Sequence, residues 1–254
     1  MHASPAVRAS ADTGADLLPH GASLTRPASL SGELLLVGSG ALELAIERRT
    51  WLLTARHGLW IPPGMAQRMR ARGTVSLCRL PIDPGAGRLG LPERARRFIA
   101  SALLRELMLR AAAPSAAGGD AYKTGLILNL ILEEVSWAAD HALLQPSDQR
   151  LRRVCEAILE NPADRRGLEA WAGYAATPSR TLGRLFHAEL GMSYQNWHQL
   201  ALATSALPRL CAGESVTRVA LELGYETPGA FSAMFRRIMR APPTQYRDTD
   251  RPNP

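Results

Sequence analysis

Apolar residues between positions 33 and 80 fall into short runs of strand length. Turn residues separate the runs, notably Gly38-Ser39-Gly40 and Pro62-Pro63-Gly64. Several short strands at near-regular spacing are typical of a small β-barrel or sandwich. The stretch DPGAGRLG at residues 83–90 predicts a loop that closes this region. The predicted strands are ELLLV, ALELAIE, TWLLTA, GLWIP and TVSLCRL.

The pattern changes to helical spacing after residue 90. Residues 91–112 and 122–142 predict two amphipathic helices joined by a loop, and a further helix is expected over 150–160. Broad apolar faces of this kind serve either the core or a dimer interface, and the pattern leaves both open. The first helix would gather its apolar residues on one face: Phe98, Leu103, Leu104, Leu107 and Met108.

Two segments of the C-terminal part, Leu168–Trp197 and Val216–Arg247, can be laid on each other. The matched positions are Phe186 with Phe235, Gly191 with Arg240, and Trp197 with Tyr246. Equal spacing between matched residues indicates an internal repeat.

Each copy predicts a helix, a tight turn and a second helix. A small residue, Ala172 or Ala220, allows close helix contact, and the turns fall at 175–177 and 224–226. A connecting helix is expected over about 194–210. Helix-turn-helix units present their second helix to the major groove of DNA.

The segments SRTLGRLFHAELGMS and GESVTRVALELGYETPGAFSAMFRR resemble the DNA-binding domain of AraC-type transcriptional regulators. The resemblance covers residues 150–247 and implies one all-helical domain whose two recognition helices enter successive major grooves. Upstream, TWLLTARHGLWIPPGMAQRMRARGTVSLCRLPID and SALLRELMLRA resemble the subgroup with a cupin-like sensor domain. That resemblance implies a small effector or a metal in the barrel and dimerisation through flanking helices.

The predicted fold class is α+β, with an N-terminal cupin-like β-barrel and flanking helices before an all-α domain of two helix-turn-helix units. The predicted domains are a disordered tail (1–16), the sensor barrel (17–90), a helical dimerisation region (91–145), a linker (146–153) and the DNA-binding domain (154–250).

Arginines distinguish the two predicted recognition helices. Arg180 and Arg184 lie one turn apart on the first, and a bidentate arginine–guanine contact gives roughly 1–3 kcal/mol of base discrimination. The second helix carries mostly small residues, followed by Arg236 and Arg237, which suit phosphates. The candidate DNA-contacting residues are Ser179, Arg180, Thr181, Arg184, Thr227, Ser232, Arg236 and Arg237.

The barrel departs from the resemblance at its metal positions. A histidine pair is usual there, and the corresponding residues here are Pro27 and Ser29; a later histidine corresponds to Gln67, and Glu33 stands where glutamine is common. Imidazoles are the usual ligands of transition metals, so we predict neither a metal nor another cofactor.

The connecting helix departs as well. Leu202 and Ser205 stand where arginines are common, and Pro208 predicts a kink or an early end, because proline in a helix interior costs roughly 3 kcal/mol. Arg240 replaces a glycine at a position that favours left-handed backbone.

Composition adds limits. The net charge of +7 favours a polyanionic partner, but only weakly, since nearly every cation is arginine and Lys123 is the only lysine. Three distant cysteines without CxxC spacing suggest a reducing cytosol. With no secretory signal and no apolar run of membrane length, we expect a cytoplasmic protein with no membrane partner. No catalytic constellation is present in the sequence, so an enzyme is not predicted.

The sequence therefore predicts an effector-responsive regulator that binds double-stranded DNA as a homodimer, with RNA polymerase as a further candidate partner. The alternative is a divergent paralogue with weak or no DNA binding, which acts through mixed dimers or other protein contacts.

Overall fold

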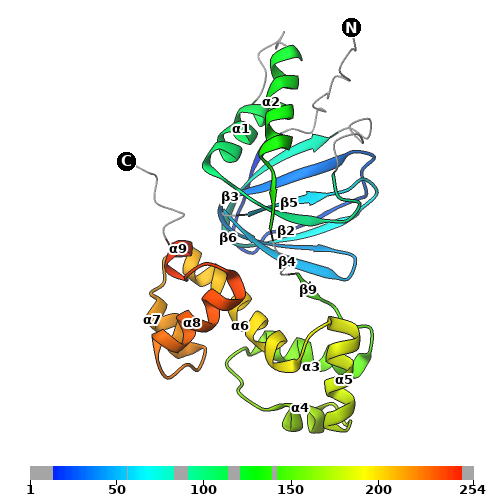
Figure 1. Cartoon of the computed structure of the whole chain (residues 1–254), viewed down its shortest axis with the longest axis vertical. Coiled ribbons are helices and arrows are strands. Elements are labelled where there is room, and N and C mark those ends of the chain that lie inside the picture. Colours follow the sequence, from blue (N-terminus) through cyan, green and yellow to red (C-terminus); the bar gives the residue numbers. More distant parts are fainter. Residues whose placement is uncertain (1–13, 56, 83–90, 114–120, 139–141, 248–254) are drawn as a thin grey trace. The chain divides into compact units, whose positions relative to one another are not determined.

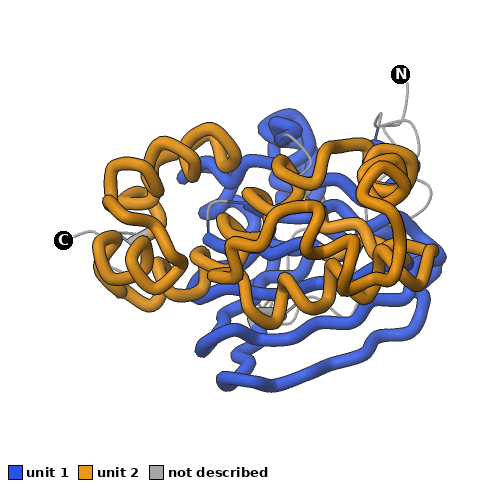
Figure 2. The backbone as a smooth tube through the Cα atoms, turned by 90° about the horizontal axis from the view of Figure 1, so that it is seen from below, with its two compact units in different colours: residues 1–47, 51–140 blue, residues 48–50, 141–254 orange. Residues whose placement is uncertain are grey.

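The computed structural model describes residues 14–55, 57–82, 91–113, 121–138 and 142–247. These residues belong to two compact units, one of residues 1–47 and 51–140 and the other of residues 48–50 and 141–254 (Figure 2). The predicted α+β class, with strands first and a helical C-terminal domain, is confirmed. The predicted disordered tail is wrong at residues 14–16, which form part of a strand, and its remainder lies outside the described residues, as does the predicted loop at 83–90.

The first unit is built on an antiparallel sheet whose described strands run in the order β1-β6-β3-β5-β7-β8 (Figure 1). Its two longest strands pair from Gly32 opposite Ile82 to Ala45 opposite Arg68. β2 pairs with β6 and β4 pairs with β3, while residues 49–50 of β4 pair with β9 within the second unit. The strands are β1 Gly14–Leu18, β2 Ser23–Arg26, β3 Gly32–Ile46, β4 Arg49–Thr54, β5 His57–Ile61, β6 Gln67–Ile82, β7 Arg96–Ile99, β8 Ser136–Trp137 and β9 Leu143–Leu144.

The predicted break at Gly38-Ser39-Gly40 is wrong, because β3 runs through it as one strand. The register shifts between Val37 and Ser39 and again between Ser39 and Ala41, which is bulge geometry. Gly40 has φ +74°, and a Cβ there would lie 2.3 Å from the carbonyl oxygen of Thr74. The glycines therefore permit a bulge and a close approach to β6 rather than a turn.

Two helices, α1 (Ala102–Ala112) and α2 (Ala121–Glu134), pack together against the sheet (Figure 1). Their buried residues join those of the strands in one apolar cluster. Burial of this area supplies the main stabilisation of the unit. The cluster includes Leu34, Leu36, Trp60, Cys78, Leu80, Phe98, Leu104, Met108, Leu128 and Ile131.

Both predicted helices of this unit are shorter than expected. Residues 96–99 form β7, which places Phe98 opposite Gly58 of β5 and buries it fully. The helix begins only after Ser101, whose Oγ accepts a hydrogen bond from the backbone of Leu104 at 3.0 Å. The second helix ends at Glu134 rather than 142, and β8 follows.

The second unit is helical, and the connecting helix expected over 194–210 is confirmed as α6. Side-chain caps fix several helix starts, among them Asp148 before α3, Ser193 before α6 and Ser215 before α7. The helices are α3 Gln149–Glu160, α4 Leu168–Tyr174, α5 Ser179–Leu190, α6 Tyr194–Cys211, α7 Val216–Glu222, α8 Pro228–Met239 and α9 Thr244–Arg247.

Proline does not end the connecting helix early. α6 continues past Pro208 to Cys211, and both Leu207 and Leu210 are buried around it. Packing of the helix on the core outweighs the lost backbone hydrogen bond, which a sequence-based rule for an isolated helix does not include. α6 therefore forms one connection between the two helical groups on either side of it (Figure 1).

Candidate nucleic-acid interface

The second unit contains the predicted repeat. α5 begins at Ser179 and α8 begins at the matched Pro228. The aromatic contacts repeat too: the ring centroids of Phe186 and Trp197 lie 5.9 Å apart, and those of Phe235 and Tyr246 lie 5.5 Å apart. Each second helix is thus anchored on the following segment by the same pair of positions.

The turns between the paired helices differ by one residue. Ala176 and Gly224 both have left-handed backbone, with φ 49° and 76°. The residue after each donates its backbone N–H to the alanine of the first helix: Thr177 to Ala172 at 3.0 Å, and Tyr225 to Ala220 at 2.9 Å. Ala176 therefore corresponds to Gly224. The predicted pairing of the turns at 175–177 and 224–226 is one residue out of register, because the second turn has one extra residue.

The first recognition helix, α5, presents a basic outer face. Leu182, Phe186 and Leu190 are buried in the core below it. Arg180 and Arg184 are exposed one turn apart, while Ser179 and Thr181 are half-buried beside them. This arrangement keeps both guanidinium groups accessible.

Most other arginines of the second unit are engaged within the protein. Arg150 pairs with Asp148 at 2.7 Å, Arg166 with Asp164 at 2.7 Å, and Arg209 with Glu214 at 2.6 Å. Among the described side chains of this unit, the arginines without a partner are Arg180, Arg184, Arg236 and Arg240. All four lie on a recognition helix or directly after one, where an anion can reach them.

The second recognition helix, α8, offers fewer groups that can read bases. Thr227 caps the helix through a hydrogen bond that its Oγ1 accepts from the backbone of Ala230 at 3.2 Å, and Ser232 is half-buried. Arg236 is exposed, whereas Arg237 donates to Oε1 of Gln199 on α6 at 2.5 Å. Arg237 therefore also holds α8 on α6.

Arg240 was missed as a candidate contact because its sequence signal concerns its backbone. It follows α8 with φ 58°, the left-handed conformation expected for the glycine that it replaces. Its side chain is exposed one turn after Arg236. Both arginines are thus available near the C-terminal end of α8.

A family model described as a helix-turn-helix domain matches residues 171–249, which include both recognition helices. The HTH-type transcriptional regulator NimR of Escherichia coli (strain K12) is 29% identical over 217 residues, or 85% of this chain and 79% of NimR. The arabinose operon regulatory protein of that strain is 26% identical over 131 residues, or 48% of this chain and 42% of that protein. The C-terminal region is an AraC-type helix-turn-helix domain.

The helix-turn-helix match and the similarity to NimR over most of both chains support a DNA-binding transcriptional regulator. Among solved structures, ToxT from Vibrio cholerae aligns over 94% of this chain and 98% of its own, with 8% identity and a TM-score of 0.40. Within the described residues, no helix has the length and apolarity needed to cross a membrane.

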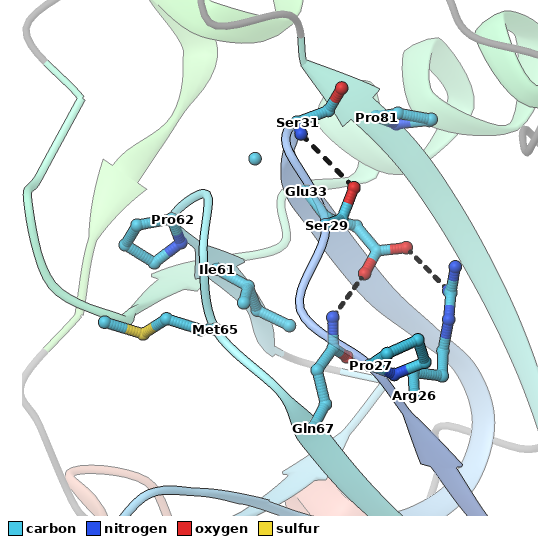
Figure 3. Close-up of a pocket in the computed structure, with 11 residues that line it drawn as sticks. Arg26, Pro27, Ser29, Ser31, Glu33, Ile61, Pro62, Met65, Gln67 and Pro81 are labelled. Carbon is cyan, nitrogen blue, oxygen red and sulfur yellow. Dashed lines mark hydrogen bonds and ion pairs between the residues drawn. The ribbon is translucent and has the colours of Figure 1, made fainter.

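The regulator's first unit has a small polar pocket at the positions that the resemblance assigns to metal ligands (Figure 3). Pro27, Ser29, Glu33 and Gln67 all line it. Gln67 donates from Nε2 to Oε2 of the buried Glu33 at 2.9 Å, and Arg26 donates to Oε1 of Glu33 at 3.1 Å. The carboxylate of Glu33 is therefore held by nitrogen donors, and no group of three metal-ligating side chains occurs among the described residues.

Gln67 has one polar atom without a partner beside this pocket. Its Nε2 must face the carboxylate of Glu33, which can only accept, so the amide orientation is fixed and Oε1 points elsewhere. Oε1 is buried and has no hydrogen-bond partner within the described structure. A buried acceptor without a partner is costly, and a ligand N–H or O–H would satisfy it.

The large apolar side chains at the centre of the strands do not line this pocket. Trp51, Trp60, Leu36 and Leu44 are at most 4% exposed, and Leu36 and Trp60 belong to the cluster under α1 and α2. His20 accepts a backbone hydrogen bond from Gly73 at 3.0 Å. These side chains support the fold of the unit.

Proposed function

We propose that this regulator binds double-stranded DNA sequence-specifically and reads bases mainly through Arg180 and Arg184 of α5. The supporting observation is the distribution of arginine partners. Away from the two recognition helices, arginines such as Arg150, Arg166 and Arg209 are paired with carboxylates, whereas Arg180 and Arg184 on α5 are exposed and unpaired. Paired guanine acceptors match the fork of an arginine.

The second helix-turn-helix unit supplies affinity and orientation in this proposal. Arg236 and Arg240 contact phosphates, and Thr227 and Ser232 add short hydroxyl contacts near the start of α8. Phosphate contacts fix orientation without reading sequence. Arg237 contributes through α6, because its guanidinium is already bound to Gln199.

Binding is tested on a duplex that the wild-type protein enriches from a pool randomised over about 25 base pairs, since two successive major grooves span about 21. Fluorescence anisotropy then compares Arg184→Ala with Arg218→Ala. Arg218 is a matched control, because its side chain is 69% exposed but paired with Glu222 on α7. Arg184→Ala should weaken binding by about 10- to 100-fold, the equivalent of one lost bidentate contact.

Two results would overturn this assignment. If Arg184→Ala binds the enriched duplex as tightly as Arg218→Ala does, α5 does not read the bases. If the wild-type protein enriches no duplex and its affinity does not change with salt, the alternative of a divergent paralogue acting through protein contacts is favoured. The left-handed Arg240 still motivates that alternative, whereas the unbroken α6 removes one reason for it.

The pocket beside Glu33 and Gln67 is the proposed effector site. Its lining combines polar groups with Pro62, Met65 and Pro81, so it suits a small organic molecule that donates a hydrogen bond to Oε1 of Gln67. Thermal-shift screening of such compounds on wild type and Gln67→Leu tests the site. Compounds that stabilise both proteins equally would place the effector elsewhere.

A homodimer is proposed through the outer face of α1 and α2. Leu103 and Leu130 are 56% and 55% exposed, and Leu109 and Leu126 are exposed as well. Exposed apolar residues of this kind mark interaction surfaces when they are contiguous. Light scattering should show a dimer that Leu103→Glu dissociates, and a monomeric wild type would refute the proposal. RNA polymerase remains a proposed partner, and the protein is placed in the cytoplasm with its DNA.

A further inference from the structure

Arg165 lies in the loop between α3 and α4, directly before the first helix-turn-helix unit, yet its side chain contacts the second. Its Nη2 donates to the carbonyl oxygen of Leu223 at 3.0 Å. Leu223 is the C-cap residue of α7, where backbone carbonyls lack partners within the helix, and Arg165 supplies one. The guanidinium of Arg165 also lies 4.2 Å from the ring centroid of Tyr225.

The turn of the second helix-turn-helix unit leaves room for this contact. A Cβ at Gly224 would lie 3.1 Å from Nε of Arg165 and 3.5 Å from the carbonyl oxygen of Ala163. Glycine at this position therefore allows the loop to approach the turn closely as well as permitting φ +76°. Tyr225 in turn packs edge-on against Phe231 of α8 at 5.5 Å, so the contact reaches the recognition helix.

The loop itself is held by residues of the first helix-turn-helix unit. Tyr194 donates from its hydroxyl to the carbonyl oxygen of Arg166 at 2.6 Å, and the Arg166 guanidinium lies 4.1 Å from the ring centroid of the buried Trp171. Asp164 accepts from the backbone and side chain of Arg166. The buried His198 of α6 lies close to Pro162 at the start of the loop. Arg165 thus projects from a rigid base.

Two routes therefore join the two helix-turn-helix units. One runs through α6, on which the second helix-turn-helix unit is held by Arg209, paired with Glu214 and with Glu222 of α7, and by Arg237, bound to Gln199. The other is Arg165, which reaches across from the loop before α4. Contacts along α6 alone leave the second helix-turn-helix unit able to rotate about that helix. A contact away from the axis of α6 restricts the rotation.

We infer that Arg165 is a positioning residue that fixes the second helix-turn-helix unit relative to the first, and thereby sets the spacing of the two DNA subsites that one protomer accepts. The inference rests on the proposed DNA binding. A rigid pair of recognition helices gains affinity from simultaneous engagement only when the subsite spacing matches its geometry.

The experiment uses the full-length protein and the enriched duplex described above, trimmed to the shortest form that one protomer occupies. Two base pairs are inserted between its subsites, which moves the second groove by about 7 Å and rotates it by about 70°. Wild type, Arg165→Ala, Arg165→Lys and Arg150→Ala are compared on both duplexes. Arg150→Ala is the matched control, because Arg150 is an exposed arginine whose partners, Asp148 and Thr177, lie outside this loop and outside the second helix-turn-helix unit.

Wild type and Arg150→Ala should lose about tenfold more affinity on insertion than Arg165→Ala does, because a loosened pair tolerates altered spacing. Arg165→Lys, which keeps the charge over Tyr225, should lie between them. Loss of stability alone would weaken binding to both duplexes alike and leave the ratio unchanged.

An equal insertion penalty in wild type and Arg165→Ala would overturn the inference, as would a wild-type protein whose enriched duplex contains one subsite only. Failure to enrich any duplex would refute the proposed function itself and so is distinguishable from both.

Discussion

Arg240 and Gly191 occupy matched positions after the two recognition helices, and both have left-handed backbone, with φ 58° and 69°. Left-handed conformation costs a residue with a Cβ about 1–2 kcal/mol. Glycine removes this strain, but it also gives the unfolded chain more conformational freedom, which lowers stability by about 0.4–1 kcal/mol. Arg240→Gly should therefore raise the free energy of unfolding by about 0.5–1 kcal/mol and the Tm by about 3 °C.

The mirror substitution isolates the backbone effect. A Cβ at Gly191 would meet no atom within 4 Å, so Gly191→Ala adds strain without a clash. It should lower the free energy of unfolding by about 1 kcal/mol. Urea unfolding monitored by circular dichroism measures both variants. If Arg240→Gly is no more stable than wild type, the strain argument is wrong.

The same variant separates stability from binding. Arg240 is exposed and without a partner in the described structure, so its removal should weaken DNA binding even though the protein is more stable. The slope of log K against log salt is negative, and one lost phosphate contact reduces its magnitude by about 0.9. An unchanged slope would show that Arg240 does not contact phosphate.

Three further predictions concern the core, the pH dependence and the dimer. Gly40→Ala should destabilise the first unit by about 3 kcal/mol, because a Cβ would clash with Thr74, whereas Gly64→Ala, with open space around it, should cost about 1 kcal/mol in the same urea titration. Burial lowers the pKa of His198, which lies beside Arg165 and Asp164, so the unfolded state binds more protons than the folded state in mild acid. The free energy of unfolding should therefore be constant above about pH 6.5 and decline below it. His198→Gln should flatten that decline between pH 5 and 7, and an unchanged slope would assign it to another group. Leu130→Glu should dissociate the dimer as Leu103→Glu does, and ultracentrifugation showing an unaltered dimer would move the interface away from α2.

The helix-turn-helix units were predictable because their signals are local. Apolar residues repeat with helical spacing, and the paired aromatic positions recur at a fixed distance along the chain. The ring contacts of Phe186 with Trp197 and of Phe235 with Tyr246 follow directly from that spacing. Local apolar runs also placed several strands, such as β4 and β5, which fall within one residue of the predicted TWLLTA and GLWIP.

Features that depend on distant partners were not predictable. Phe98 fits a helical face as well as a strand, and only pairing with β5 decides between them. Gly38 and Gly40 signal a turn, although β6 makes them a bulge. Which arginines remain available depends on contacts such as that between Arg237 and Gln199, which lie 38 residues apart. Sequence therefore identified the basic helices but not the engagement of Arg237 or the availability of Arg240.

The central claim is that one recognition helix reads the bases and the other positions the protein. Its most direct test is the affinity of wild type for every single base-pair substitution of the enriched duplex. We predict losses of about 1–3 kcal/mol confined to a few base pairs within one major groove, which disappear in Arg180→Ala and Arg184→Ala. Equal losses in both grooves, or losses that persist in these variants, would contradict the account.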